Sequence, residues 1–468
     1  MAEILKPDLC VIGAGALGTR LAILARQRGL EVTLLPRPRD EANDPTAGAL
    51  RRAAFIASAN RAHAIRTAGT LGMNNADPKP NFRSIGERAT AIADAVAPRD
   101  TDERLTALGI TLLSDEASFT DPKTLRCGET TVRARHFVLA TGATPSIPAL
   151  PGLDQVKYFT PETIADNLRK LSHLVVIGGT PVAFELAQAY QRLGSMVTLV
   201  PQGGLLPGFD PELVAVLLRH LREEGLTVLD DAEVTAIQPR SQGTGVSLIR
   251  AGSEEKLDVS HILVAMGNEP DLDASVLDAA KLRRDRKDTG ALLLGVEGQS
   301  SSKVLSAIGG AAGEDAPHLG LRQAQLLLDR LTGQGHGRLD PFQVSRLVNT
   351  SPPLAQLGLL PRDEKLRPGQ TVLRANLAET DAGRAISATG VVRAVVDARG
   401  SVASFGAVGS GAGELASLLA LVGPRLPDLK NLALPPASLA AALVDLAEQF
   451  AATQPQAKTL SLLKKFRG

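Results

Sequence analysis

The sequence predicts an α/β protein in which two doubly wound domains precede an α+β domain. An internal repeat carries this prediction, because residues 9–36 (LCVIGAGALGTRLAILARQRGLEVTLLP) align without a gap with residues 174–201 (LVVIGGTPVAFELAQAYQRLGSMVTLVP). Each copy reads as a strand, a glycine turn, an amphipathic helix and a second strand, which is a β-α-β unit. A second pair, FVLATGATP at 137–145 and ILVAMGNEP at 262–270, recurs in the same order. We therefore expect two Rossmann-like folds.

The domain boundaries follow from this repeat and from shifts in composition. The proline-rich PSIPALPG at the end of residues 1–152 closes the first domain, and the second spans 153–272. Residues 273–335 contain a strand, a glycine turn and a helix, and we expect them to return to the first domain. Short β-like runs and an Ala/Leu-rich helical segment follow over 336–468, the α+β domain.

The composition narrows the function classes and the compartment. The 468 residues are 44% hydrophobic and 22% charged, which is ordinary for a globular protein with substantial cores. A formal net charge of +1 gives no electrostatic reason to expect nucleic acid or an anionic membrane as partner. The chain has only two cysteines, lacks a signal-peptide pattern and has no apolar run long enough to span a bilayer. These features predict a cytoplasmic protein.

The first glycine loop has the residues that a dinucleotide pyrophosphate requires. Gly13, Ala14, Gly15 and Gly18 lie in GAGALG, between a predicted strand and a predicted helix. The first glycine permits the tight turn, the second lets backbone approach the pyrophosphate, and the third allows close packing of helix and strand. The acidic residue that holds ribose hydroxyls at the end of the second strand is replaced by Pro36. The sequence predicts a phosphate site with a weakened ribose contact.

The second glycine loop departs further from that pattern. Its glycine positions are Gly178, Thr180 and Ala183, and Pro201 replaces the ribose-binding acid. A threonine side chain at the middle position stands where a pyrophosphate needs bare backbone. The sequence therefore argues against nucleotide binding at this loop.

Several further motifs give the chain a specific resemblance. Beyond the first glycine loop they are ATGATP at 140–145, LLPGFDPEL at 205–213, VAMGNEP at 264–270, NTSPPLAQLGL at 349–359 and FGAVGSGAGEL at 405–415. With these motifs the chain resembles the pyridine nucleotide-disulfide oxidoreductases, which include dihydrolipoamide dehydrogenases and mercuric reductases. The resemblance covers nearly the whole chain. It implies FAD in the first domain, NAD(P)H in the second and a homodimer formed by the C-terminal dimerisation domain.

The resemblance also assigns binding residues by position. For FAD it implies the first loop together with Thr141, Gly142 and Gly309, and for the nicotinamide nucleotide it implies Gly178 and Glu185. The family's Gly-Asp, whose carboxylate binds the flavin ribityl chain, is here Gly309-Gly310. Loss of this acid and of the ribose-binding acid weakens the expected FAD site, because each hydrogen bond to a charged group is worth roughly 1.5–3 kcal/mol.

The catalytic residues of the family are replaced. The two cysteine positions of the redox disulfide fall on Asp44 and Ala49, and the histidine and glutamate of the proton relay fall on Leu434 and Leu439. None of these side chains can form a disulfide or relay a proton in the family's manner. We assign no catalytic residue and no metal ligand from the sequence.

Two functions remain open at this stage. The leading interpretation is a degenerate family member that acts through binding, as a partner of an active relative, a subunit of a multienzyme complex or a nucleotide sensor. The alternative is an active FAD-dependent NAD(P)H oxidoreductase that passes electrons directly from the flavin to a small acceptor. Such an enzyme needs no cysteine pair.

Overall fold

The structure is a computed structural model of the chain. It describes residues 3–35, 44–96, 100–272, 278–283, 292, 294, 299–314, 316–335, 340–358, 360 and 366–454. The chain forms two compact units, Met1–Gly204 with Leu229–Leu339, and Leu205–Val228 with Asp340–Gly468. The three domain boundaries expected from the sequence stay a prediction.

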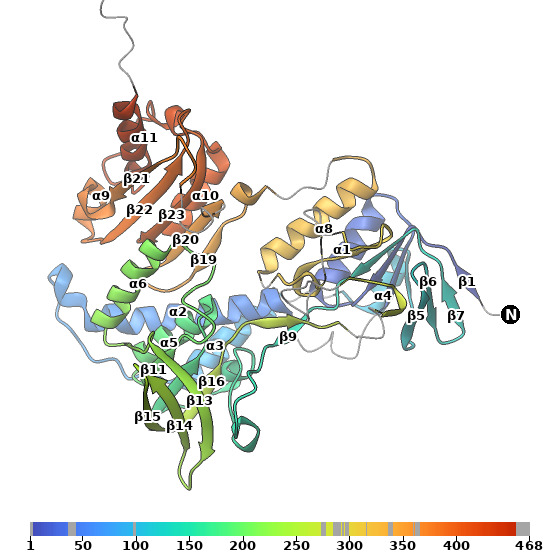
Figure 1. Cartoon of the computed structure of the whole chain (residues 1–468), viewed down its shortest axis with the longest axis horizontal. Helices are drawn as coiled ribbons and strands as arrows, with labels where there is room; N and C mark the ends of the chain where they lie inside the picture. Colours follow the sequence, from blue (N-terminus) through green and yellow to red (C-terminus); the bar gives the residue numbers. More distant parts are fainter. Residues whose placement is uncertain are drawn as a thin grey trace, which may run out of the picture. The chain divides into compact units, whose positions relative to one another are not determined.

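A parallel sheet forms the centre of the N-terminal part of the first unit. Its order is β18 (Leu305–Ala307), β8 (His136–Leu139), β2 (Leu9–Ile12), β3 (Val32–Leu35) and β4 (Ile110–Leu112). These strands are almost continuously apolar, as expected for a sheet covered on both faces. Helices α1 (Ala16–Gln27) and α8 (Pro317–Leu331) lie side by side (Figure 1) and pack with the sheet in one apolar core. A smaller sheet of β1 (Ile4–Leu5), β7 (Thr130–Val132), β6 (Thr124–Cys127) and β5 (Ala117–Asp121) accompanies it.

The second β-α-β unit forms another parallel sheet in the same compact unit. Strand β10 (His173–Ile177) pairs in parallel with β11 (Met196–Val200) and β16 (His261–Val264), and α5 (Pro181–Arg192) connects the first two. An antiparallel sheet follows, made of β13 (Ala232–Pro239), β14 (Thr244–Arg250) and β15 (Ser253–Val259). The two segments that the sequence paired as ATGATP and VAMGNEP meet as antiparallel strands β9 (Ala143–Pro145) and β17 (Asn268–Pro270).

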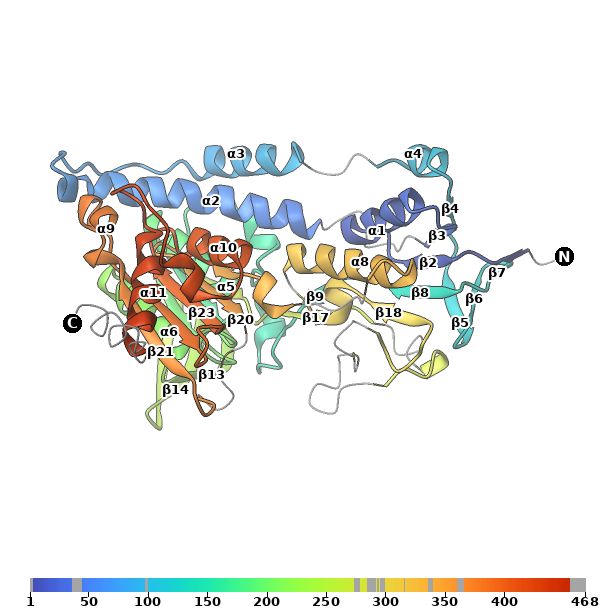
Figure 2. The same cartoon turned by 90° about the horizontal axis from the view of Figure 1, so that it is seen from above.

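A long helix joins the two sheets of the first unit. Helix α2 (Pro45–Arg66) runs alongside α3 (Phe82–Asp94), as Figure 2 shows. Tyr190 of α5 packs against Phe55 and Phe82 of these helices, with ring centroids 5.2 and 6.2 Å apart. Helix α4 (Asp102–Ala107) precedes β4.

The second unit is built on a five-stranded antiparallel sheet. Its order is β19 (Arg346–Val348), β20 (Leu354–Gly358), β23 (Val402–Gly409), β22 (Gly390–Val396) and β21 (Thr371–Asn376). Helices α10 (Ala412–Val422) and α11 (Ala441–Thr453) share its apolar core. Two more helices, α6 (Pro211–Glu223) and α9 (Asp381–Ala385), belong to this unit. The predicted fold class is confirmed: parallel α/β sheets are followed by an α+β C-terminal part.

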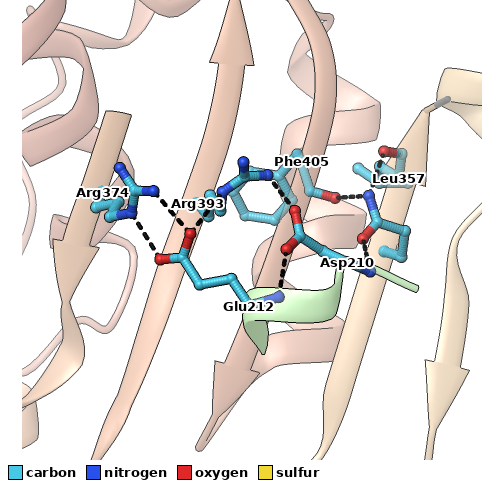
Figure 3. A network of polar contacts seen from close by, with 7 residues as sticks. Asp210, Glu212, Leu357, Arg374, Arg393 and Phe405 are labelled. Carbon is cyan, nitrogen blue, oxygen red and sulfur yellow. Dashed lines mark hydrogen bonds and ion pairs between the residues drawn. The ribbon is translucent and has the colours of Figure 1, made fainter. Parts of the chain in front are cut away.

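Helix α6 is fixed to the C-terminal sheet by a network of charged groups (Figure 3). Asp210, the N-cap of α6, is 4% exposed, and its carboxylate pairs with Arg393 of β22. Arg393 also forms an ion pair with Glu212 at 3.1 Å. Arg374 of β21 donates two hydrogen bonds, of 2.6 and 2.7 Å, to the same carboxylate. The hydrogen bond from Arg374 lowers the pKa of Glu212. The network explains why residues 205–228 join the C-terminal unit.

A buried histidine gives the first unit a predicted sensitivity to acid. His136 of β8 is 6% exposed and shares a 3.0 Å hydrogen bond with Ser306, which also accepts a hydrogen bond from Arg330. Burial, and then the charge of Arg330, lower the pKa of His136 from 6.5 to about 4. Between these pH values His136 is protonated in the unfolded chain but neutral in the folded chain. The free energy of unfolding is therefore highest above pH 6.5 and falls as the pH is lowered towards 4.

We expect a loss of up to about 3 kcal/mol over that pH range, and a His136→Asn variant should not show it. Denaturant unfolding followed by circular dichroism at several pH values measures the difference. Because the cause is burial, added salt should leave the wild-type profile nearly unchanged. An identical pH profile for the variant would contradict this account of His136.

Candidate functional site

The first glycine loop lies at the carboxyl ends of β2 and β8. Gly13 has φ +107°, a conformation that favours glycine, and a side chain there would overlap the Ala140 carbonyl oxygen. A side chain at Gly18 would overlap the carbonyl oxygen of Gly13. Gly15 is the N-cap of α1 with φ −61° and ψ 174°, extended backbone that any residue can adopt. Packing therefore requires glycine at the first and third positions, whereas the backbone conformation of the second suits any residue.

The N-terminus of α1 is prepared for an anion. Among the described residues no side chain caps this helix, and its first turn carries no acidic residue. Thr19 donates its hydroxyl to the Ala14 carbonyl at 2.8 Å, which steadies the loop. The backbone of Thr141 adjoins Gly13, and the hydroxyl oxygen of Thr141 is buried and has no hydrogen-bond partner among the described residues. A helix N-terminus without a side-chain cap and a buried unsatisfied hydroxyl fit the pyrophosphate of a dinucleotide.

The part of the site that would meet a flavin ribityl chain is formed by closely packed backbone. Gly142 (φ +79°) and Gly309 (φ +59°) lie in the turns that follow the neighbouring strands β8 and β18. A Cβ on Gly310 would lie 2.7 Å from the backbone nitrogen of Ala143 and 2.7 Å from the carbonyl carbon of Gly142. Backbone therefore occupies the space into which the family's aspartate would extend. The residues fit the phosphate part of FAD and do not fit its ribityl part.

The ribose-binding position cannot be described in the same way. Pro36, where the sequence lacks the expected acid, lies outside the described residues, together with Arg37 and Arg39.

The second glycine loop is satisfied by its own protein groups. Thr180 caps α5 by accepting the Ala183 N–H at 3.3 Å, and its hydroxyl donates to the Ala265 carbonyl at 2.9 Å. Gly178 has φ +139° and packs on that same carbonyl. A side chain on Gly179 would overlap the carbonyl oxygen of Gly204, so the segment after β11 lies directly on the loop. At this loop the protein itself therefore supplies the group that caps the N-terminus of α5.

Glu185 has a partner that the sequence did not suggest. Its carboxylate is 7% exposed and accepts a 2.9 Å hydrogen bond from Arg52 of α2. The neighbouring Arg51 donates to the Ala165 carbonyl at 2.9 Å and pairs with Asp166 at 2.8 Å. Both arginines follow closely after Ala49 in the sequence, but their partners lie more than 100 residues away, beyond the reach of a local pattern.

The positions of the redox cysteines have structural roles in α2. Asp44 is the N-cap of the helix and accepts the N–H of Thr46 at 2.8 Å, while Ala49 is partly buried within the helix. The actual cysteines, Cys10 of β2 and Cys127 of β6, are buried in the same apolar core. Burial raises the pKa of both thiols, which disfavours the reactive thiolate.

The proton-relay positions have become apolar. Leu439 packs against the core of the C-terminal sheet and lies against Gly411, and Leu434 is partly buried. The described part of the chain contains no group of three or more His, Cys, Asp or Glu residues placed to hold a metal ion. Within the same residues, no helix has both the length and the apolar character needed to cross a membrane.

Comparisons with known proteins agree with the fold and its glycine loops. A family model described as pyridine nucleotide-disulphide oxidoreductase matches residues 7–326. The dihydrolipoyl dehydrogenase of Thermus scotoductus is 29% identical over 463 residues, covering 94% of this chain and 96% of that protein. The mercuric reductase of Streptomyces lividans is 28% identical over 363 residues, 75% of each chain.

A comparison with solved structures supports the fold, and only the fold. The HOCl-induced flavoprotein disulfide reductase RclA from Escherichia coli superposes with a TM-score of 0.75 at 18% identity. That superposition covers 96% of this chain and 100% of RclA. The family match, which spans residues 7–326 and so includes both glycine loops, establishes that the chain belongs to the pyridine nucleotide-disulfide oxidoreductase family.

Proposed function

We propose that this chain is a family member that does not reduce disulfides and acts through binding. The observation that carries the proposal is Asp44: where the family has a redox cysteine, this residue uses its carboxylate to cap α2. A disulfide reductase needs a thiolate that can attack or receive electrons at that place. Ala49 at the second position and the burial of Cys10 and Cys127 support the same conclusion.

The nucleotide loops support a division of roles between the two Rossmann-like folds. At the first loop no described side chain caps the start of α1, so we propose that Gly13, Ala14, Gly15, Gly18, Thr141, Gly142 and Gly309 line its nucleotide site. At the second loop Thr180 already caps α5, which supports a fold that has lost NAD(P)H. Gly178 and Glu185 then serve packing and the ion pair with Arg52.

The partner that we propose is a second copy of the chain. Helix α10 exposes Leu421 at 84%, Val422 at 53% and Leu418 at 43%. Large apolar side chains grouped on one helix commonly mark a protein interface. Pairing with an active relative or a multienzyme complex is an alternative outcome of the test below. The cytoplasmic location stays a prediction from the sequence.

We expect Leu421→Asp to convert a dimer into a monomer, because a carboxylate would then be buried in an apolar interface. Size-exclusion chromatography with light scattering measures the mass. Met196→Asp, which also changes an apolar residue exposed at 64%, is the matched control and should leave the mass unchanged. A dimer that survives Leu421→Asp would place the interface elsewhere, and a monomeric wild type would contradict the proposal.

The absorption spectrum of the purified chain, with and without NADH or NADPH under anaerobic conditions, tests the proposed function. We expect added NADH or NADPH to bleach no flavin band, whether or not FAD has been supplied. Prompt bleaching of bound FAD would contradict a role in binding alone.

The second candidate is an active flavoprotein that transfers electrons from FAD directly to a small acceptor. The observation that favours it is the intact geometry of the first glycine loop, in a family whose named relatives are reductases and dehydrogenases. Prompt bleaching in the same experiment, followed by reoxidation on adding a quinone or dioxygen, is the result that this candidate requires.

A further inference from the structure

We propose that the first Rossmann-like fold recognises the diphosphate of a nucleotide and makes no contacts specific for the flavin. The inference rests on the proposed function and defines its ligand: a nucleoside diphosphate, either free or as part of a dinucleotide. The evidence is a difference between two ends of the nucleotide site at the first glycine loop. The end at the N-terminus of α1 is open to an anion, and the end at Gly310 is closed by backbone.

At the open end, no side chain caps α1 among the described residues, and the first turn of the helix carries no acidic residue. The first N–H groups of α1 follow Gly15, whose side chain is a hydrogen atom. The Thr141 Cα would lie 3.1 Å from a Cβ on Gly13, and the buried hydroxyl oxygen of Thr141 is unsatisfied among the described residues. A buried hydroxyl without a partner is costly, so a phosphate oxygen that accepts its hydrogen bond would be favoured.

At the closed end, Gly310 lies against the turn that follows β8. Its missing Cβ would be 2.7 Å from the Ala143 nitrogen and 2.9 Å from the Ala143 Cβ, distances at which atoms must move. The turn cannot retreat easily, because Gly142 accepts a 3.1 Å hydrogen bond from the Asp271 N–H and β9 is paired with β17. Where the family has an aspartate, this chain therefore has Gly310, packed against the backbone of residues 142–143. A ribityl hydroxyl would meet no carboxylate acceptor at this position.

The start of α2, where the family places its cysteines beside the flavin, is occupied in the same way. Asp44 accepts the Thr46 N–H, and Pro45 has no N–H to offer. Further along the helix, Arg51 and Arg52 are paired with Asp166 and Glu185. Among the described residues at this end, the Asp44 carboxylate and the Arg51 and Arg52 guanidinium groups are therefore engaged by protein partners, although the buried Nε of Arg51 has no hydrogen bond. A single guanidinium nitrogen does not favour FAD over ADP.

Isothermal titration calorimetry of the full chain with ADP, FAD and FMN tests the proposal. We expect ADP and FAD to bind within about threefold of each other, and FMN, a flavin with one phosphate, at least tenfold more weakly. FAD binding tenfold or more tighter than ADP would overturn the proposal. So would the failure of ADP to bind, or a protein that retains FAD through gel filtration.

Substitution of Gly310 tests the closed end separately. If the ribityl contact lacked only a carboxylate, Gly310→Asp would raise FAD affinity about tenfold or more; we expect no gain. Gly310→Ala keeps the test decisive if the aspartate variant does not fold, because a Cβ alone is expected to lower the melting temperature. Gly48→Ala is the control, since that glycine has no atom within 4 Å of its missing Cβ. A Gly310→Ala variant with an unchanged melting temperature would contradict the conclusion that backbone closes this end of the site.

The outcomes separate this inference from the proposed function. Tight FAD binding without reduction by NADH or NADPH would overturn the diphosphate proposal and leave the binding role standing. Equal binding of ADP and FAD, with bleaching of the bound flavin, would overturn the binding role and leave the diphosphate proposal standing.

Discussion

Replacing Arg393 with methionine is expected to lower the free energy of unfolding by about 3–5 kcal/mol, because it leaves a buried carboxylate without its cation. Asp210, the N-cap of α6, has a side chain only 6% exposed and pairs with Arg393, whose side chain is 15% exposed. In the variant, α6 would lose its attachment to β22. Denaturant unfolding gives the total loss, and hydrogen–deuterium exchange of peptides from α6 shows where it falls.

Arg374 supplies the matched control for this experiment. It belongs to the same network and binds Glu212 with two hydrogen bonds, but its side chain is 50% exposed and that of Glu212 is 39% exposed. Exposed pairs contribute little, so Arg374→Met should cost about 1 kcal/mol or less. Equal losses for the two variants would show that burial of Asp210 does not decide the strength of the network.

Replacing Gly15 with leucine is expected to reduce nucleotide binding at the first loop at least 100-fold while leaving the fold intact. The backbone there has φ −61° and suits any residue, so the change should not strain the loop. The side chain would instead project where a pyrophosphate approaches the first N–H groups of α1. Calorimetry with ADP or FAD measures the loss, and an unchanged melting temperature confirms that the protein still folds.

The contrast between two glycines of the same loop sharpens this prediction. Gly18→Leu should unfold or strongly destabilise the domain, because its Cβ would overlap the carbonyl oxygen of Gly13. Gly15→Leu should change binding alone. If Gly15→Leu bound ADP or FAD as the wild type does, the phosphate would lie elsewhere and the assignment of the first loop would be wrong.

The sequence predicted the fold well because the fold rests on local, repeated patterns. The aligned segments at 9–36 and 174–201 gave both parallel sheets and their connecting helices, since apolar β-branched runs and glycine turns act over short distances. The attachment of α6 to the C-terminal sheet was not predictable in this way. It depends on a pair of charges, Asp210 and Arg393, that are 183 residues apart.

The sequence showed which functional residues of the family are replaced at the candidate site. It did not show which contacts the replacing residues make. Asp44 and Ala49 were identified from the sequence as the cysteine positions, and Asp44 before a proline is itself a recognisable helix N-cap signal. The sequence showed that Gly310 lacks a carboxylate, but the approach of the 142–143 backbone to it depends on the pairing of β9 with β17. The partner of Glu185, Arg52, likewise required the packing of α2 on α5.

The most direct test of the central claim, a disulfide reductase fold without a redox disulfide, is disulfide reduction by the purified chain supplied with FAD and NADH or NADPH. Release of thiolate from an aromatic disulfide, and reduction of lipoamide to dihydrolipoamide, would be followed for the wild type and for a Cys10→Ala, Cys127→Ala double variant. The account predicts no reduction above the rate without protein for either. Reduction by the wild type that disappears in the double variant would show that the two buried cysteines form the missing redox pair, and would contradict the account.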